Sequence, residues 1–291
     1  MKPALFLSIL FLISCSNSES QSMITTNENV VSAEVLDNEY QPINENGRTI
    51  AERFNPPSGF ERVKEGDNSF TSYLQNLPLK PHNTVVQYYD GGFKSADVYD
   101  AVVDLEIGDR DLHQCADAVM RLRAEYLWKN KQYDKIHFNF TNGFRVDYSK
   151  WREGYRIKVR GNNVGWVKSA QPSDSYKTFW KYMEIIFSYA GTLSLEKELK
   201  PVEYSKMKVG DVLIQGGSPG HAIIVVDMAV NPDSGKKVYL LAQSYMPAQE
   251  IQILKNENRG ANSPWYELND SYAVLTPEWD FYTTDLKRFV D

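Results

Sequence analysis

The sequence predicts an α+β domain in which an antiparallel sheet packs against helices. Its C-terminal third contains short runs rich in β-branched residues, separated by turn residues, as in a meander of antiparallel strands. The middle of the chain instead places apolar residues three and four positions apart, which is the helical spacing. Two cysteines, at positions 15 and 115, exclude a disulfide framework.

The N-terminal segment predicts a secretory signal peptide over residues 1–14. Lys2 supplies the positive charge, and the apolar run at residues 4–13 is far shorter than the roughly 20 residues that a membrane-spanning helix needs. The run ends in LISC (residues 12–15), which resembles a bacterial lipobox, so Cys15 is expected to be lipidated. The alternative is an ordinary signal peptide with a chance cysteine. A lipidated Cys15 places the protein in the cell envelope, and the lack of an aspartate after it favours the outer membrane.

Residues 15–49 are predicted to be a lipidated N-terminus and a flexible tether. Residues 16–22 (SNSESQS) are polar and lack aromatic side chains, and an Asn-, Glu- and Thr-rich composition continues to Arg48. Such a composition buries too little apolar surface to fold on its own. The first closely spaced phenylalanines and prolines occur at residues 50–60, so a single folded domain is expected over residues 50–291.

Hydrophobic periodicity defines the elements of that domain. Ala118, Val119, Leu122 and Tyr126 share one face of a helix, and NPDSG (residues 231–235) separates two β-rich runs as a turn. The elements expected in chain order are strands at 84–89 and 101–107, a helix at 114–128, a strand at 136–140, helices at 176–189 and 194–199, and strands at 212–214, 221–229, 237–245 and 250–254.

Composition excludes several classes of function. The net charge is −6 and no basic stripe is present, which argues against a nucleic-acid partner. Four scattered histidines and one cysteine beyond the lipobox give no metal-ligand spacing, so neither a metal nor a cofactor is expected. No second apolar run approaches the length of a spanning helix, and we expect a monomer whose membrane contact is its lipid anchor.

Cys115 is the candidate nucleophile because it lies in the first turn of its predicted helix. Free backbone N–H groups and the helix dipole at that end favour the thiolate, whereas Asp117 in the same turn opposes it. Gln114, or the backbone N–H of Cys115, is a candidate for binding an oxyanion. Arg121 and Glu125 are expected to form an i, i+4 ion pair, and Arg123 or Arg121 is a candidate for holding a substrate carboxylate. The alternative for Cys115 is a small buried residue, and His113 is expected to be a surface or cap residue.

His221 is the candidate base, and Gln243 is its candidate partner. His221 follows a Gly- and Pro-rich segment (residues 215–220) and stands at the start of a strand, where a side chain can reach a groove. If the turn centres near Asp233, paired positions sum to about 466, which places His221 and Gln243 diagonally adjacent on one face. Gln243 can then orient the imidazole as the third member of a triad. The alternatives are a turn histidine and a surface glutamine.

This order of residues resembles the papain-like cysteine peptidase superfamily, especially its NlpC-type and CHAP amidase branches. The segments HQCADAVMRLRAEYL (113–127), PGH (219–221) and LAQSYMPAQE (241–250) also resemble an uncharacterised family of Bacteroidetes-type secreted lipoproteins. The superfamily resemblance implies a papain-like antiparallel sheet packed against a Cys-bearing helix. It also implies amide hydrolysis or acyl transfer, often on cell-wall stem peptides.

The sequence departs from compact NlpC-type domains in two ways. About 105 residues separate Cys115 from His221, which predicts a helical insert that forms a lid or a substrate wall, and glutamine is an unusual third member. We therefore expect a cell-envelope thiol hydrolase of amide bonds that acts on peptides or peptidoglycan fragments. The competing expectation is a non-catalytic envelope protein that binds such a ligand in the same groove.

Overall fold

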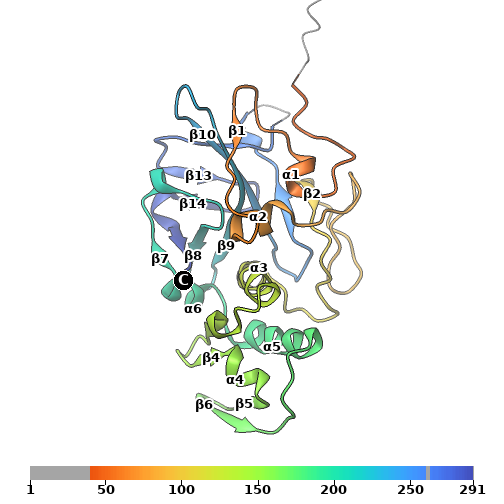
Figure 1. The fold of residues 1–291 in the computed structure, drawn as a ribbon, viewed down its shortest axis with the longest axis vertical. Coiled ribbons are helices and arrows are strands. Elements are labelled where there is room, and N and C mark those ends of the chain that lie inside the picture. The colour runs from red at the N-terminus through yellow and green to blue at the C-terminus, as the bar shows by residue number, and fades with distance from the viewer. Residues whose placement is uncertain (1–39, 260–262, 291) are drawn as a thin grey trace, which may run out of the picture. The chain divides into compact units, whose positions relative to one another are not determined.

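A nine-stranded antiparallel sheet forms the centre of this computed structural model, which describes residues 40–259 and 263–290 (Figure 1). Along the main path the strand order is β2-β11-β10-β9-β8-β15-β7, while β1 pairs with β9 and β12 with β10. Together with the helices, this sheet confirms the predicted α+β class. The predicted signal peptide, Cys15 and the tether up to residue 39 lie outside the described residues.

The elements follow one another in this order. The helices are α1 (Ile50–Arg53), α2 (Phe70–Gln75), α3 (Cys115–Lys129), α4 (Tyr148–Arg152), α5 (Tyr176–Tyr189) and α6 (Thr192–Glu198). The strands are β1 (Glu61–Arg62), β2 (Tyr99–Val102), β3 (His137–Asn139), β4 (Arg145–Asp147), β5 (Tyr155–Arg160), β6 (Asn163–Lys168), β7 (Lys200–Pro201), β8 (Val212–Gln215), β9 (His221–Val230), β10 (Lys237–Gln243), β11 (Gln252–Leu254), β12 (Tyr266–Leu268), β13 (Ala273–Leu275), β14 (Asp280–Tyr282) and β15 (Leu286–Arg288).

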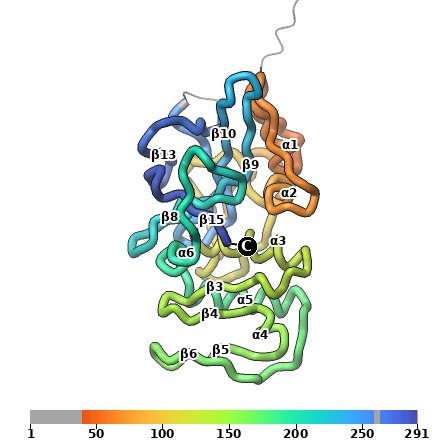
Figure 2. Tube along the Cα trace, turned by 60° about the vertical axis from the view of Figure 1, so that its left-hand side comes forward, coloured from red at the N-terminus to blue at the C-terminus, as the bar shows by residue number. Residues whose placement is uncertain are grey.

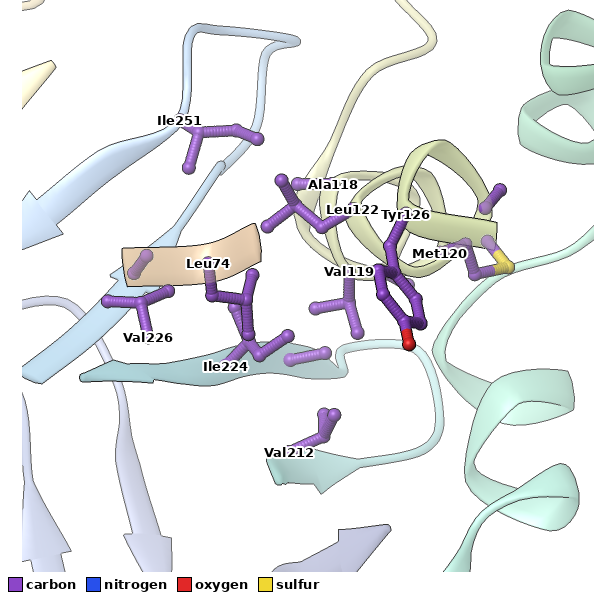
Figure 3. Packing of buried hydrophobic residues seen from close by; sticks show 14 of the residues in the cluster. Leu74, Ala118, Val119, Met120, Leu122, Tyr126, Val212, Ile224, Val226 and Ile251 are labelled. Carbon is purple, nitrogen blue, oxygen red and sulfur yellow. The ribbon is translucent and has the colours of Figure 1, made fainter. Parts of the chain in front are cut away.

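Both faces of the sheet are buried, which explains why β9 is an almost unbroken apolar run. Successive side chains of a strand point to opposite faces. Ile224 and Val226 of β9 therefore belong to the cluster that includes α3, whereas Ile223 and Val225 belong to a second cluster with Phe281 of β14. Figure 3 shows the first face, where Val119 and Leu122 of α3 gather with Leu74 over Ile224.

The insert between α3 and α6 forms a second layer against α3. It contains the hairpins β3–β4 and β5–β6, with α4 and α5, and lies on the far side of α3 from the sheet (Figures 1 and 2). Its own core is aromatic, since the Tyr148 ring packs edge-on against Phe179 and Tyr182. The helix α3 is consequently buried on nearly all sides and is a rigid platform for its first residue.

Most predicted elements are confirmed, with three corrections. The predicted helix at 114–128 is α3, shifted by one residue, and α5 has the predicted bounds. The predicted strand at 84–89 is wrong, because only isolated bridges at Gln87 and Tyr88 form there. The predicted strand at 101–107 is β2, which begins and ends earlier, at Tyr99–Val102.

The third correction concerns the boundary at residue 50. The compact unit begins at Tyr40, so residues 40–49 belong to it and not to a tether. The backbone N–H of Asn44 donates to the carbonyl of Arg53 at 2.7 Å, and the buried Arg53 guanidinium donates to the carbonyl of Gly47 at 2.6 Å. Within the described residues, none of the helices is long and apolar enough to cross a membrane.

Candidate active site

The first residue of α3 lies where strands β9 and β10 separate. The two strands pair through Leu241↔Val225 and Ala242↔Ile224, so the predicted pairing sum of 466 is confirmed at this end. A register shift between Leu240 and Leu241 changes the pairing nearer the turn. Because β10 ends at Gln243, the backbone N–H of Ala222 is directed at the Cys115 thiol and favours its thiolate.

The loop after β10 holds the segment before α3 in place. The backbone N–H of Ala248 donates to Asp111 Oδ1 at 2.7 Å, and the Ser244 hydroxyl lies 2.9 Å from the carbonyl of His113. These bonds tie the residues immediately before Cys115 to the residues immediately after Gln243. The positions of the two candidate site residues are therefore coupled through the backbone.

His113 is part of this connection, so its prediction as a surface or cap residue is wrong. Its ring is fully buried and packs edge-on against Phe187. Nδ1 donates to the carbonyl of Gln249 at 3.2 Å, which leaves Nε2 to accept from Arg121 at 3.5 Å. Burial, together with the Arg121 charge, lowers the pKa of His113 to about 3, so the ring is neutral at physiological pH. Arg121 also forms the predicted ion pair with Glu125, at 3.6 Å.

His221 and Gln243 are joined by a hydrogen bond. His221 Nε2 and Gln243 Oε1 are 2.8 Å apart, and both side chains are only 1% exposed. An amide oxygen only accepts, so Nε2 carries the proton and Nδ1 carries the lone pair. The imidazole is enclosed by the rings of Tyr245 at 4.8 Å, Trp279 at 5.6 Å and Phe281 at 5.9 Å.

A hollow of about 420 Å³ opens beside Cys115. Gln114, Cys115 and Asp117 from the start of α3 line one side, and Gly220, immediately before His221, lines another. Thr141, Phe187 and Ala190 of the insert also line it, so the insert supplies part of the wall of this hollow. Cys115 itself is 7% exposed.

Gly220 is required by close packing at the entry to β9. A Cβ atom at this position would lie 2.6 Å from the Thr192 hydroxyl and 2.7 Å from the carbonyl oxygen of Gln215. Since one of these neighbours is backbone, a side chain could not be accommodated by a rotamer change. The glycine thus lets β8 and β9 approach α6 closely, next to the hollow.

Arg123 lies elsewhere. It lines a different hollow with His137, Glu198 and Phe289, and its guanidinium stacks over the Phe70 ring at 5.1 Å. Two turns of helix separate it from Cys115, and the structure does not bring it to the hollow beside the thiol. Gln114 does line that hollow, and its side-chain amide donates one hydrogen to Asp111 at 3.0 Å.

Burial dominates the electrostatics of the site. Burial, reinforced by the nearby Asp117 carboxylate, raises the pKa of the Cys115 thiol to about 11, although three backbone N–H groups act in the opposite direction. Burial likewise lowers the pKa of His221 to about 4, against the raising effect of its bond to Gln243. The expectation that the helix end stabilises a thiolate is therefore wrong for this arrangement, since desolvation outweighs the helix N–H groups. Thiol and imidazole are both neutral at pH 7.

Among the described residues, no hydrogen bond joins the Cys115 thiol to His221 or occupies Nδ1 of the imidazole. The thiol nonetheless lies beside the backbone on both sides of His221, through Ala222 and the shared hollow at Gly220. Within the same residues, His, Cys, Asp and Glu side chains form no cluster that could hold a metal ion. The chemistry available to the site is that of a neutral thiol beside a neutral base.

Comparison with known families gives one match. Residues 50–288 match DUF4846, described as "Domain of unknown function (4846)". The chain belongs to this family. The match covers the whole sheet, α3 and the insert, so Cys115, His221 and Gln243 all lie within the family domain. No curated protein and no solved structure matches the chain.

Sequence reasoning missed several residues that surround the candidate triad of this DUF4846 domain. Glu278 and Lys94 connect to Gln243, and Tyr245, Trp279 and Phe281 enclose His221. Glu278 and Trp279 lie in a short loop between β13 and β14, where no periodicity marks them. Tyr245 could have been found, since it lies directly opposite His221 in the predicted register.

Proposed function

We propose that this domain is a thiol hydrolase of amide bonds, with Cys115 as nucleophile, His221 as base and Gln243 as the residue that orients His221. One observation carries the proposal. The Cys115 thiol, at the N-terminus of α3, lines a hollow and is met by the backbone N–H of Ala222, the residue after His221. The His221 ring is fixed by a 2.8 Å bond from Nε2 to Gln243. That bond leaves Nδ1 free to accept a proton, as a general base must.

The reaction follows from these roles. The Cys115 sulfur attacks the carbonyl carbon of a bound amide while Nδ1 of His221 takes the thiol proton. Under this proposal the backbone N–H of Cys115 and the second amide hydrogen of Gln114 bind the oxyanion, since both residues line the hollow. His221 then returns the proton to the leaving amine, and water hydrolyses the thioester to release the acid and the thiol. Transfer of the acyl group to an amine instead of water uses the same residues.

The substrate class we favour is a peptide, in particular a peptidoglycan stem peptide. Two features support it: the resemblance of the Cys, His and strand order to the NlpC-type and CHAP branches of the papain-like superfamily, and the lipobox at Cys15. Under this proposal the fold is papain-like, with the insert as one substrate wall. The protein is a lipid-anchored monomer of the cell envelope, held at the outer membrane.

The second candidate is a non-catalytic domain that binds a peptide in the same hollow. It is favoured by the protonation states, since the thiol pKa of about 11 and the histidine pKa of about 4 oppose a preformed ion pair. The thiol–imidazole hydrogen bond is also unformed. Catalytic hydrogen bonds are often long without substrate and tighten in the complex, so this observation does not remove the first candidate.

Digestion of purified peptidoglycan separates the two candidates. The wild-type chain should release new amino termini from stem peptides, detected by mass spectrometry. Cys115→Ala and His221→Ala should each abolish release, and Gln243→Ala should weaken it, with effects that do not add. His82→Ala, a partly buried histidine outside the site, is the matched control. Retained binding by the wild type without any new termini would establish the binding role, and cleavage by Cys115→Ala would overturn the thiol mechanism.

The anchor is tested separately. Cys15→Ser should move the protein from the membrane fraction to the soluble fraction of the envelope and should stop incorporation of labelled fatty acid. If labelled fatty acid is still incorporated into this variant, the lipobox assignment is wrong.

A further inference from the structure

A buried chain of polar groups continues from Gln243 on the side away from His221. Gln243 Nε2 donates to Glu278 Oε2 at 2.6 Å. Lys94 Nζ donates to both oxygens of Glu278, at 2.8 and 2.6 Å, and to Gln249 Oε1 at 3.1 Å. The side chains of Lys94 and Glu278 are 3% and 17% exposed. Four side chains from separate parts of the chain thus meet behind the imidazole.

The carboxylate fixes which end of the Gln243 amide faces the histidine. An ionised carboxylate has only acceptor oxygens, so the group that contacts it must be the NH₂ of the amide. The amide oxygen is then forced towards Nε2 of His221. If the amide turned over, its NH₂ would face Nε2, and the imidazole would have to carry its proton on Nδ1 instead. Only the first arrangement leaves Nδ1 able to accept a proton.

Lys94 bonds both oxygens of the Glu278 carboxylate. Burying a carboxylate without a partner is unfavourable, and an ammonium group that bonds both oxygens offsets that cost. Burial lowers the pKa of Lys94, and Glu278 acts in the opposite direction to keep it charged. The ammonium also lies 5.6 Å from the centre of the Tyr245 ring, which packs on His221. Glu278 therefore contacts Gln243 and Lys94 contacts Tyr245, and each of these two neighbours contacts His221.

We propose that Glu278, held by Lys94, is a positioning residue that fixes the tautomer of His221 through the amide of Gln243. The proposed hydrolase activity depends on this tautomer, so the inference rests on the proposed function for its catalytic consequence. The tautomer itself is measurable without any substrate.

The test is nitrogen NMR on the full chain with ¹⁵N-labelled histidine, with the His221 signals assigned by their loss in His221→Gln. The wild type should show a single neutral form, protonated at Nε2. Glu278→Gln keeps the shape but adds a donor, so the Nδ1–H form should appear beside it. Glu250→Gln is the matched control, because Glu250 is also a buried partner of a lysine and does not contact Gln243. It should leave the His221 signals unchanged.

A second variant, Glu278→Asp, provides the same test. If Glu278→Gln fails to fold, Glu278→Asp, which is one methylene too short for the 2.6 Å contact, should give the same mixture. Should either folded variant retain the Nε2–H form alone, the inference is overturned whether or not the protein is a hydrolase. A wild type protonated on Nδ1 would overturn it equally.

Activity gives an independent result. In Glu278→Gln, kcat should fall in proportion to the fraction of the Nδ1–H form, with KM unchanged, since Glu278 is not among the residues that line the hollow beside Cys115. If the wild type shows the single tautomer and no hydrolysis, the proposed function fails while the positioning role stands. If hydrolysis occurs without any change in tautomer between variants, the positioning role fails while the proposed function stands.

Discussion

The protonation state of Cys115 predicts an unusually slow thiol whose reactivity rises with pH. The perturbation is Asp117→Asn, introduced into a Cys15→Ser chain so that Cys115 is the sole thiol. Asparagine can still accept the backbone N–H of Gln114, which Asp117 Oδ2 accepts at 3.0 Å, so the start of α3 should persist. The substitution removes the Asp117 carboxyl group. Burial raises the pKa of that carboxyl well above its usual range, and its negative charge, once ionised, is the second cause, after burial, of the raised thiol pKa.

The magnitude follows from the fraction of thiolate. At pH 7.5 a thiol with a pKa of about 11 is thiolate in ~3 of 10,000 molecules, against ~1 in 11 for a free cysteine with a pKa of about 8.5. The thiolate fraction of Cys115 is thus about 300-fold smaller than that of a free cysteine. A more basic thiolate is, however, intrinsically more nucleophilic, by roughly 13-fold for this difference in pKa. Cys115 should therefore react about 20-fold more slowly than a model thiol, before any effect of its low exposure.

The assay is the rate of iodoacetamide alkylation between pH 6 and pH 10. In the wild-type site a plot of the logarithm of the rate against pH should rise with unit slope and reach no plateau. Low accessibility of the thiol would lower every rate equally and would not change this shape. Asp117→Asn should shift the profile to lower pH, whereas Asp109→Asn, a charge change on an exposed loop, should not. His221→Ala should leave the profile in place, because an imidazole with a pKa of about 4 supplies no charge here. A plateau below about pH 8.5 would refute the reasoning.

Three further predictions test the fold around the site. The pKa of His113 is about 3 in the folded chain and 6.5 in the unfolded chain, so its stability contribution is present above pH 6.5 and is lost as the pH falls towards 3. Between pH 7 and pH 5 the free energy of unfolding of His113→Phe should therefore fall by about 2 kcal/mol less than that of the wild type, and an equal fall would contradict the buried neutral ring. A fragment that begins at Tyr40 should melt several degrees above one that begins at Ile50, since only the first keeps Gly47, whose carbonyl accepts from the buried Arg53 of α1. Equal melting temperatures would mean that residues 40–49 do not contribute. Gly220→Ala should lower the free energy of unfolding by about 1–3 kcal/mol, whereas Gly66→Ala, in open space, should change it little; similar values would show that the entry to β9 is not tightly packed.

The sequence was sufficient to predict the elements that are strongly periodic. Both long helices and the strands β8 to β11 follow from local patterns, because amphipathic spacing and β-branched runs between turn residues are properties of neighbouring positions. The pairing of His221 with Gln243 also followed, since a turn centre fixes which residues of a hairpin lie opposite each other. Residues 40–49 could not be predicted as folded, because they are held by single hydrogen bonds to Arg53 and its surroundings.

The rest of the site depends on contacts between distant segments. Glu278 reaches Gln243 from 35 positions away and Lys94 reaches Glu278 from 184 positions away, and neither has a pattern in its own neighbourhood. The buried state of His113 and the raised pKa of Cys115 have the same origin. Burial depends on how the insert and the loop after β10 cover α3, and this coverage cannot be inferred from the sequence of the helix alone. Desolvation therefore raises the pKa of the Cys115 thiol, whereas the helix N-terminus alone had predicted a lowered pKa.

The protonation states also constrain how an active site of this kind would work. Moving a proton from a thiol of pKa about 11 to an imidazole of pKa about 4 costs about 10 kcal/mol before the two charges attract each other. A turnover of one per second allows a total barrier of about 17 kcal/mol. A preformed ion pair would use more than half of that barrier, so proton transfer has to accompany attack on the carbonyl, as it does for hydroxyl nucleophiles.

Such a step requires a lone pair on Nδ1 at the moment of attack. A hollow that only binds peptides has no such requirement, and the chain from His221 through Gln243 to Glu278 and Lys94 would then have no tautomer to fix. We propose the hydrolase rather than the binding domain on this ground, because only the hydrolase requires the tautomer that the chain is proposed to fix.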